Sequence, residues 1–109
     1  MGQLRENQVR FMKMVPLLIN KAFELGFEVT GGDLFRDHRC KYGNDKSLHK
    51  KRLAIDLNLF KDGKYLTSAI DHKPLGVFWE HLGGTWGGRF GESKKGAGDG
   101  WDGNHYQWG

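Results

Sequence analysis

The chain has 109 residues, a formal net charge of +4 and a single cysteine, Cys40. This length fits one domain covering 1–109, and seven Phe, four Trp and three Tyr supply enough large side chains for a core. A single cysteine excludes an internal disulfide and every zinc site built from several thiolates, whereas the positive charge favours an anionic partner without choosing its class. No apolar run approaches membrane length, and MGQLRENQVRF lacks the apolar stretch of an export signal, so we expect synthesis in the cytoplasm.

Residues 3–25 have the apolar spacing of an amphipathic helix. The residues that share this spacing are Leu4, Phe11, Met12, Val15, Leu18, Ile19, Ala22 and Phe23. Because proline is tolerated in the first turn of a helix and disruptive inside one, Pro16 predicts two helices that meet near Val15. The second helix would begin at Pro16 and end at Gly26, and FEVT, residues 27–30, is typical of a short strand.

A polar segment, residues 31–46, predicts a long loop, and the strand predicted after it has a period-two pattern. The side chains expected to face the core are Leu53, Ile55, Leu57 and Leu59. The side chains expected on the opposite face are Ala54, Asp56, Asn58 and Phe60. KDGK, residues 61–64, supplies an Asp-Gly turn, and YLTS, residues 65–68, returns as the second arm of a hairpin.

The C-terminal part predicts one short helix followed by a turning, glycine-rich segment. Apolar residues at helical spacing follow Pro74 and stop at Gly83, which predicts a helix over 74–82. Ten of the seventeen glycines lie from Gly83 onward, but five aromatic residues in this segment favour a packed loop over disorder, and NHYQW has strand character. The order helix, strand, hairpin, helix, strand indicates an α+β fold with a small antiparallel sheet.

Two pairs of histidine and carboxylate lie far apart in the sequence. In SLHKKRLAIDL, His49 precedes Asp56 by seven positions, and both side chains reach one point if the chain bends near Lys51. In WDGNHYQW, Asp102 lies three residues before His105. Two imidazoles and one carboxylate would form a tetrahedral zinc site with the fourth position left for water, and Asp102 would act as a base.

Each of these residues also has a simpler interpretation. An aspartate on the outer face of a strand is usually solvated, and Asp102 in a glycine-rich turn can be a turn former. A lone histidine in a loop is usually an ordinary surface residue, and we assign His38, His72 and His81 to that class. Spacing alone therefore leaves a zinc site and a solvated surface open as alternatives.

The order of the motifs is more specific than any one of them. SLHKKRLAIDL resembles the Ser-x-His-x6-Asp signature of a zinc metallopeptidase family that comprises D-alanyl-D-alanine carboxypeptidases, D-alanyl-D-alanine dipeptidases and phage L-alanyl-D-glutamate endopeptidases. DGNH is similar to the acidic-x-x-His element of this family, and TWGGRF is similar to the Trp-Gly-Gly stretch of its phage endolysin branch. VPLLINKAFELGFEVTGGDLFR is similar to the helix, strand and arginine that open the catalytic domain, so the resemblance covers most of the chain.

The resemblance implies a role for each matching residue. The zinc ligands would be His49, Asp56 and His105. Asp102 would be the general base, and Arg36 would contact the substrate carbonyl and stabilise the oxyanion. Ser47, beside the first ligand, would contact the substrate or support that ligand.

Three departures from the family pattern bear on these roles. Leu34-Phe35-Arg36 stands where relatives often have Gly-Tyr-Arg, so Arg39 competes with Arg36 for the oxyanion contact. GESKKGAGDG is longer and richer in glycine than usual, which leaves Asp99 as a rival of Asp102. The third departure is Tyr106, which follows the last histidine where Phe is commoner, and we expect it to have no consequence.

The resemblance implies a zinc-dependent peptidase that cleaves peptidoglycan stem peptides, as a phage endolysin with L-alanyl-D-glutamate endopeptidase activity. The fold would be the one that D-alanyl-D-alanine carboxypeptidases share with Hedgehog proteins. The chain would be a monomer whose partner is bacterial peptidoglycan. It would not bind nucleic acid, and it would not associate stably with a membrane. The chain would be made in the host cytoplasm without a signal peptide and would reach the wall after holin-type release.

Three other functions compete with this one. A D-alanyl-D-alanine carboxypeptidase of the same family would trim the stem terminus instead of cutting next to the glycan. A basic nucleic-acid-binding domain or small His/Asn nuclease could use His38, Asn44 and His49, although a ββα-metal pattern is lacking. A binding protein could keep the fold and the metal without turnover, but suitable residues at every proposed ligand and base position argue against it.

Overall fold

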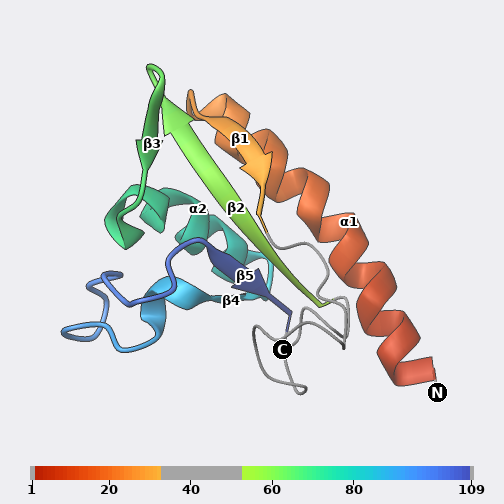
Figure 1. Cartoon of the computed structure of the whole chain (residues 1–109). Coiled ribbons are helices and arrows are strands. Elements are labelled where there is room, and N and C mark those ends of the chain that lie inside the picture. The colour runs from red at the N-terminus through yellow and green to blue at the C-terminus, as the bar shows by residue number, and fades with distance from the viewer. Residues whose placement is uncertain (1, 33–52, 109) are drawn as a thin grey trace, which may run out of the picture.

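The structure of the chain is a computed structural model that describes residues 2–32 and 53–108 (Figure 1). The elements, in chain order, are α1 (Gly2–Glu24), β1 (Glu28–Gly31), β2 (Ala54–Lys61), β3 (Lys64–Leu66), α2 (Ala69–His81), β4 (Thr85–Trp86), the 3-10 helix η1 (Gly87–Arg89) and β5 (His105–Gln107). Within these residues every strand pairing is antiparallel, so the predicted α+β class with a small antiparallel sheet is confirmed.

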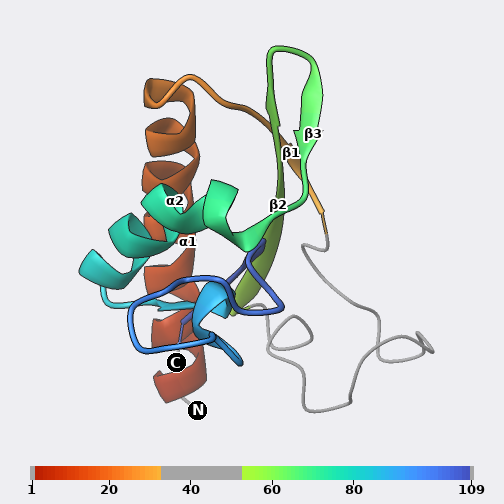
Figure 2. The same ribbon diagram turned by 90° about the vertical axis from the view of Figure 1, so that its left-hand side faces the viewer.

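The sheet has the order β1-β2-β5-β4, and β3 also pairs with β2. Figure 2 shows that α1 and α2 lie on the same face of this sheet. The turn between β2 and β3 has φ values of 52° at Asp62 and 78° at Gly63, the left-handed conformation at both central positions that an Asp-Gly hairpin turn requires. The predicted hairpin is confirmed, with its second arm at Lys64–Leu66 instead of 65–68. The predicted strand at 27–30 is also confirmed, shifted by one residue to Glu28–Gly31.

α1 is a single helix that runs through Pro16, so the prediction of two helices meeting near Val15 is wrong. A proline inside a helix costs about 3 kcal/mol, because it removes one hydrogen bond and crowds the preceding turn. Apolar side chains before and after the proline belong to one core, and their burial offsets this cost. These buried residues of α1 are Phe11, Met14, Val15, Leu18 and Ala22.

The buried stripe of α1 is narrower than the predicted apolar face. Met14 is buried although the spacing did not mark it, whereas Leu4, Met12 and Phe23 are 46%, 65% and 55% exposed. The sheet and α2 cover only the stripe that starts at Phe11, and neighbouring apolar residues around the helix remain in solvent. In the described part of the chain, neither helix combines the length and the apolar character needed to cross a bilayer.

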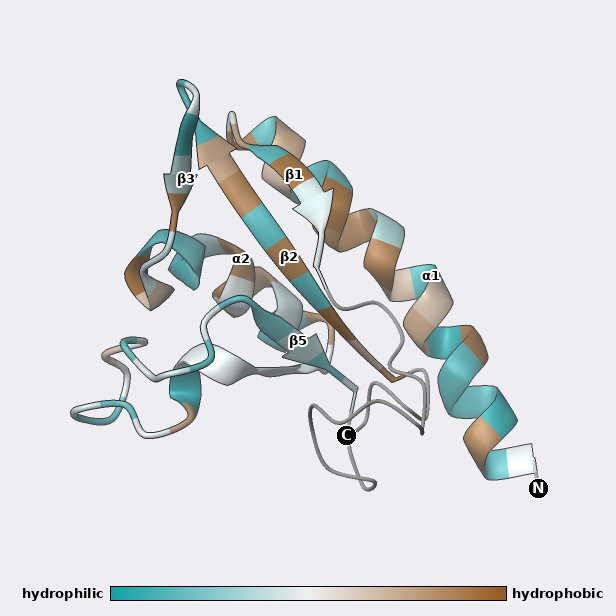
Figure 3. Cartoon of the chain, viewed as in Figure 1, coloured by the Kyte–Doolittle hydropathy of each residue, from teal (hydrophilic) through white to brown (hydrophobic). Residues whose placement is uncertain are grey.

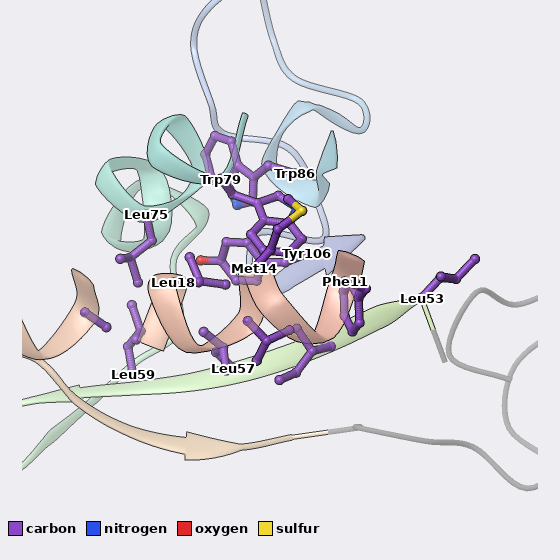
Figure 4. Packing of buried hydrophobic residues seen from close by; sticks show 13 residues of the cluster. Phe11, Met14, Leu18, Leu53, Leu57, Leu59, Leu75, Trp79, Trp86 and Tyr106 are labelled. Carbon is purple, nitrogen blue, oxygen red and sulfur yellow. The ribbon is translucent and has the colours of Figure 1, made fainter. Parts of the chain in front are cut away.

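β2 supplies the centre of the core, and its alternation is visible in Figure 3 as successive hydrophobic and hydrophilic residues. The predicted core residues are all buried: Leu53, Ile55, Leu57 and Leu59. They pack with Trp79, Trp86 and Tyr106, which come from α2, β4 and β5 (Figure 4). Asp56 and Asn58 alternate with them and are only half-buried, as predicted for the opposite face.

α2 begins at Ala69, five residues before the predicted start at Pro74. Ser68 caps the helix, because its side chain accepts a hydrogen bond from the backbone N–H of Ile70 at 3.2 Å. Pro74 therefore lies in the second turn instead of the first. The end is close to the prediction, since the helix stops at His81 and Gly83 adopts a φ of 100° just beyond it.

The glycine-rich segment forms a packed loop around Trp86, which confirms the prediction of a packed loop over a disordered segment. The indole is fully buried and its Nε1–H donates to the carbonyl of Gly103 at 2.7 Å. A Cβ at Gly76 or Gly88 would overlap the Trp86 ring, so both positions require glycine. The predicted strand at the C-terminus is confirmed as β5, whereas β4 and η1 were not predicted.

His72 is buried, so its assignment to the surface is wrong. It is 2% exposed, and its Nδ1 lies 2.8 Å from the hydroxyl of Tyr106. Burial lowers the pKa of His72 from 6.5 to about 4, although the charge of Asp71 raises it in part. His81 is exposed as expected, and His38 lies outside the described residues.

We expect the stability of the protein to fall as the pH falls from 6.5 to about 4 through this histidine. In that window the unfolded chain protonates His72 while the folded chain excludes the proton, which removes about 3 kcal/mol of unfolding free energy. Urea unfolding at several pH values should show that the free energy of unfolding falls less with falling pH in His72→Gln than in the parent. His81→Gln is the matched control and should keep the parental pH dependence; equal slopes in all three proteins would contradict the assignment.

Candidate functional site

The register of β2 and β5 places Asp56 directly opposite His105. The next position along the ladder is hydrogen-bonded, because Leu57 N–H donates to the carbonyl of Asn104 at 2.9 Å. Asp56 and His105 therefore form a non-hydrogen-bonded pair, in which opposing side chains approach most closely. The Oδ1 atom of Asp56 lies 3.0 Å from Nδ1 of His105. Two residues that are 49 positions apart in the sequence thus lie side by side on neighbouring strands.

Asp56 lies on the face of β2 opposite to the one that contacts the helices. Gly32 extends the pairing of β1, because its N–H donates to the carbonyl of Asp56 at 2.8 Å. A Cβ at Gly32 would lie 3.1 Å from the Cβ of Asp56. A side chain at position 32 would therefore crowd this carboxylate, so glycine keeps the space beside it.

His105 is 8% exposed and its two ring nitrogens contact different oxygens. Nδ1 faces Asp56, and Nε2 lies 2.7 Å from Oε1 of Gln107. Burial lowers the pKa of His105, but the hydrogen bonds with Asp56 and Gln107, together with the negative charges of Asp102 and Asp56, raise it more. The net pKa shift is upward, so the surroundings of the ring favour positive charge, as expected next to two carboxylates.

Asp102 is the third member of the cluster. One carboxylate oxygen, Oδ2, lies 3.9 Å from Nδ1 of His105, and its backbone carbonyl accepts a hydrogen bond from His105 N–H at 3.0 Å. The side chain is 30% exposed, more than that of Asp56 at 17%. Asp102 can therefore reach both the imidazole and a molecule that approaches from solvent.

Two glycines of the turn fix the position of Asp102. A Cβ at Gly87 would overlap the carbonyl of Asp102, and a Cβ at Gly103 would overlap Ala69 at the start of α2. The hydrogen bond from Trp86 to the carbonyl of Gly103 holds the same turn from the core side. The Trp86-Gly87-Gly88 stretch thus acts on the site through the backbone of residues 102 and 103.

Asp99, the rival of Asp102, is engaged elsewhere in the loop. Its Oδ1 accepts from the N–H of Ser93 at 2.8 Å, and its Oδ2 accepts from the Ser93 hydroxyl at 2.6 Å. These hydrogen bonds lower the pKa of Asp99 below its usual value. The Asp99 carboxylate stabilises the loop conformation, and of the two rivals it is Asp102 that lies near His105.

The sequence-predicted site is therefore described in part. The structure brings together Asp56, Asp102 and His105. The remaining predicted site residues lie outside the described residues: His49, Ser47, Arg36 and Arg39. Among residues 2–32 and 53–108, no group of three His, Cys, Asp or Glu side chains is arranged to hold a metal ion.

The donor atoms of Asp56 and His105 are of the types that zinc binds, and they could supply two of its ligands. Zinc accepts imidazole nitrogen and carboxylate oxygen, and Oδ1 and Nδ1 are close enough to bind one ion together. A third protein ligand would have to come from outside the described residues, which is where His49 lies. The side chains of Asp56 and His105 are chemically compatible with the predicted metal.

Three residues around His105 were not predicted. Gln107 contacts Nε2, and the ring centroid of Phe90 lies 6.1 Å from that of His105. Trp101, whose ring centroid is 5.8 Å from that of Phe90, is 77% exposed next to Asp102. The spacing of His105 and Gln107 was a usable signal, because residues two apart on a strand share a face.

Comparisons with known proteins found no match to a protein-family model, a curated protein or a solved structure. The interpretation of the site rests on the residues of this chain and on their arrangement.

We expect Gly87→Ala to disturb the site through the backbone of Asp102. The added methyl would overlap the Asp102 carbonyl, and such overpacking typically costs about 1–3 kcal/mol. Amide NMR shifts should move at residues 102–105, and urea unfolding should show the loss of stability. Gly96→Ala is the control, because a Cβ there meets no atom within 4 Å and only the positive φ of 86° is unfavourable. Unchanged shifts at 102–105 in Gly87→Ala would contradict this role.

Proposed function

We propose that the chain is a zinc-dependent peptidase that cleaves peptidoglycan stem peptides, with the L-alanyl-D-glutamate endopeptidase activity of a phage endolysin. The observation that carries the proposal is that Asp56 on β2 and Asp102 in the turn before β5 both place a carboxylate oxygen near Nδ1 of His105, at 3.0 and 3.9 Å. These are the described members of the set that the motif pattern assigns to zinc binding and to the base. The α+β arrangement would then be the fold of D-alanyl-D-alanine carboxypeptidases.

Asp56 and His105 would hold the zinc ion together with His49. A carboxylate and two imidazoles leave one position of a tetrahedral ion open, as catalytic zinc sites do. When bound, zinc supplies a Lewis acid that makes hydroxide available near neutral pH. The rigid β2–β5 pairing would hold two of the ligands in place before the metal binds.

Asp102 would act as the general base and then as the general acid. Its carboxylate would take a proton from the attacking water and deliver it to the leaving amine of the cleaved peptide. Two observations support this role: its partial exposure, and the turn that fixes it 3.9 Å from the imidazole of His105. Arg36 would stabilise the oxyanion, with Arg39 as its competitor, and Ser47 would contact the substrate or the first ligand.

The positive charge of the chain is compatible with peptidoglycan as its partner. Bacterial walls carry anionic polymers and stem-peptide carboxylates, which a net charge of +4 would attract. The proposal includes a monomer made in the host cytoplasm and released to the wall by a holin-type route, without stable binding to membranes or nucleic acid.

The proposal is tested by zinc content and by mass spectrometry of digested muropeptides for the parent and three variants. We expect the parent to bind zinc and to cut stem peptides, and His49→Ala to lose the metal. Asp102→Ala should keep zinc and lose turnover by a factor of about 10²–10⁴, the usual contribution of a general acid–base group. Asp99→Ala is the matched control, because this carboxylate is occupied by Ser93, and it should retain both properties.

Two results would contradict the proposal. A parent protein without bound zinc would remove the metal site, and an Asp102→Ala variant with parental turnover would remove the base. Release of terminal D-alanine alone would replace the endopeptidase by a carboxypeptidase of the same family.

A further inference from the structure

We propose that Gln107 is a positioning residue that holds His105 in the orientation and tautomer in which Nδ1 can bind a divalent cation. The inference rests on the proposed function for the identity of that cation as zinc. The contact itself does not depend on the proposed function, because Oε1 of Gln107 lies 2.7 Å from Nε2 of His105.

The strand geometry places the amide beside the imidazole. His105 and Gln107 are two residues apart on β5, so both side chains lie on the same face of the sheet. In the register of the sheet, Gln107 lies between Ala54 of β2 and Thr85 of β4. The small side chain of Ala54 takes little of the space on this face.

The backbone of Gln107 is also fixed. Trp79, which is fully buried, donates its indole N–H to the carbonyl of Gln107 at 2.9 Å. An indole anchored in the core thus holds the residue whose side chain contacts His105. The position of the amide is therefore set by the core and not only by the hydrogen bond that it makes.

A neutral imidazole carries one proton, and its two nitrogens compete for it. The carboxylate of Asp56, 3.0 Å from Nδ1, favours the tautomer with the proton on Nδ1, which cannot bind a cation through that nitrogen. Gln107 favours the other tautomer, because its carbonyl oxygen accepts from Nε2–H. Removal of this acceptor would take away the 2.7 Å contact that favours a proton on Nε2.

Partners on the second nitrogen of a metal-binding histidine usually fix its tautomer and ring orientation, and their loss weakens metal binding about 10- to 100-fold. In this chain Asp56 and Gln107 therefore favour opposite tautomers of one ring. Asp56 would change from a hydrogen-bond acceptor to a ligand when the cation arrives, whereas Gln107 would keep the same bond in both states.

The test compares the full-length parent with Gln107→Leu, which removes the acceptor, and Gln107→Glu, which keeps an oxygen at the same place. Long-range ¹H–¹⁵N spectra of the metal-free proteins at pH about 9, where histidine is neutral, report the tautomer of His105. Zinc affinity is measured by competition with a chelator. Thr85→Val, which changes the neighbour of Gln107 on β4, controls for general disturbance of the sheet.

We expect Gln107→Leu to raise the fraction of His105 with the proton on Nδ1 and to weaken zinc binding about 10- to 100-fold. Gln107→Glu should raise the fraction with the proton on Nε2 and bind zinc at least as tightly as the parent, because a carboxylate is a stronger acceptor than an amide oxygen. Thr85→Val should stay close to the parent in both measurements. A parental tautomer ratio in Gln107→Leu would overturn the inference, whether or not the protein binds zinc. A parent that binds zinc but leaves stem peptides intact would overturn only the proposed function, because neither readout uses a substrate.

Discussion

The register between β2 and β5 is the constraint on which the site depends. Leu57 and Tyr106 are buried on the core face of these strands, and Asp56 and His105 alternate with them on the other face. A slip of one residue would turn the aspartate into the core and a leucine into solvent, so burial of the apolar residues fixes the pairing of the polar ones. The position of the two candidate ligands opposite each other is thus set by the burial of the apolar residues beside them.

Trp86 links the core to the second half of the site. Its ring is enclosed by glycine positions that no other residue could occupy without overlap, and its indole N–H holds the turn that carries Asp102. Arg89 extends this unit, because its guanidinium lies 5.2 Å from the Trp86 ring and forms two hydrogen bonds with Glu80 on α2. Gly88 and Gly98 of this segment leave room for the Trp86 ring, whereas Gly87 and Gly100 leave room for neighbouring backbone, so close packing accounts for these glycines.

The three residues of β5 face two different environments, the core and the candidate site. Tyr106 points into the core, where its hydroxyl meets His72, while His105 and Gln107 point to the candidate site. The tyrosine hydroxyl, expected to have no consequence, has a buried partner, and burial raises its pKa well above the usual value, so it stays protonated. A polar contact on the core face of β5 and a polar contact on the site face together anchor a strand of only three residues.

The sequence by itself determined the elements whose patterns are local: the strands that form β1 and β2, the Asp-Gly turn after β2, and the helical character of α1 and of the second half of α2. Motif order also pointed to Asp56, Asp102 and His105. Only the tertiary structure decided that α1 continues through Pro16 and that His72 is buried against Tyr106. Residue spacing reports which side chains share a face of one element, whereas the free energy of burying that face, and the partner it meets, depend on segments 30 to 50 positions away.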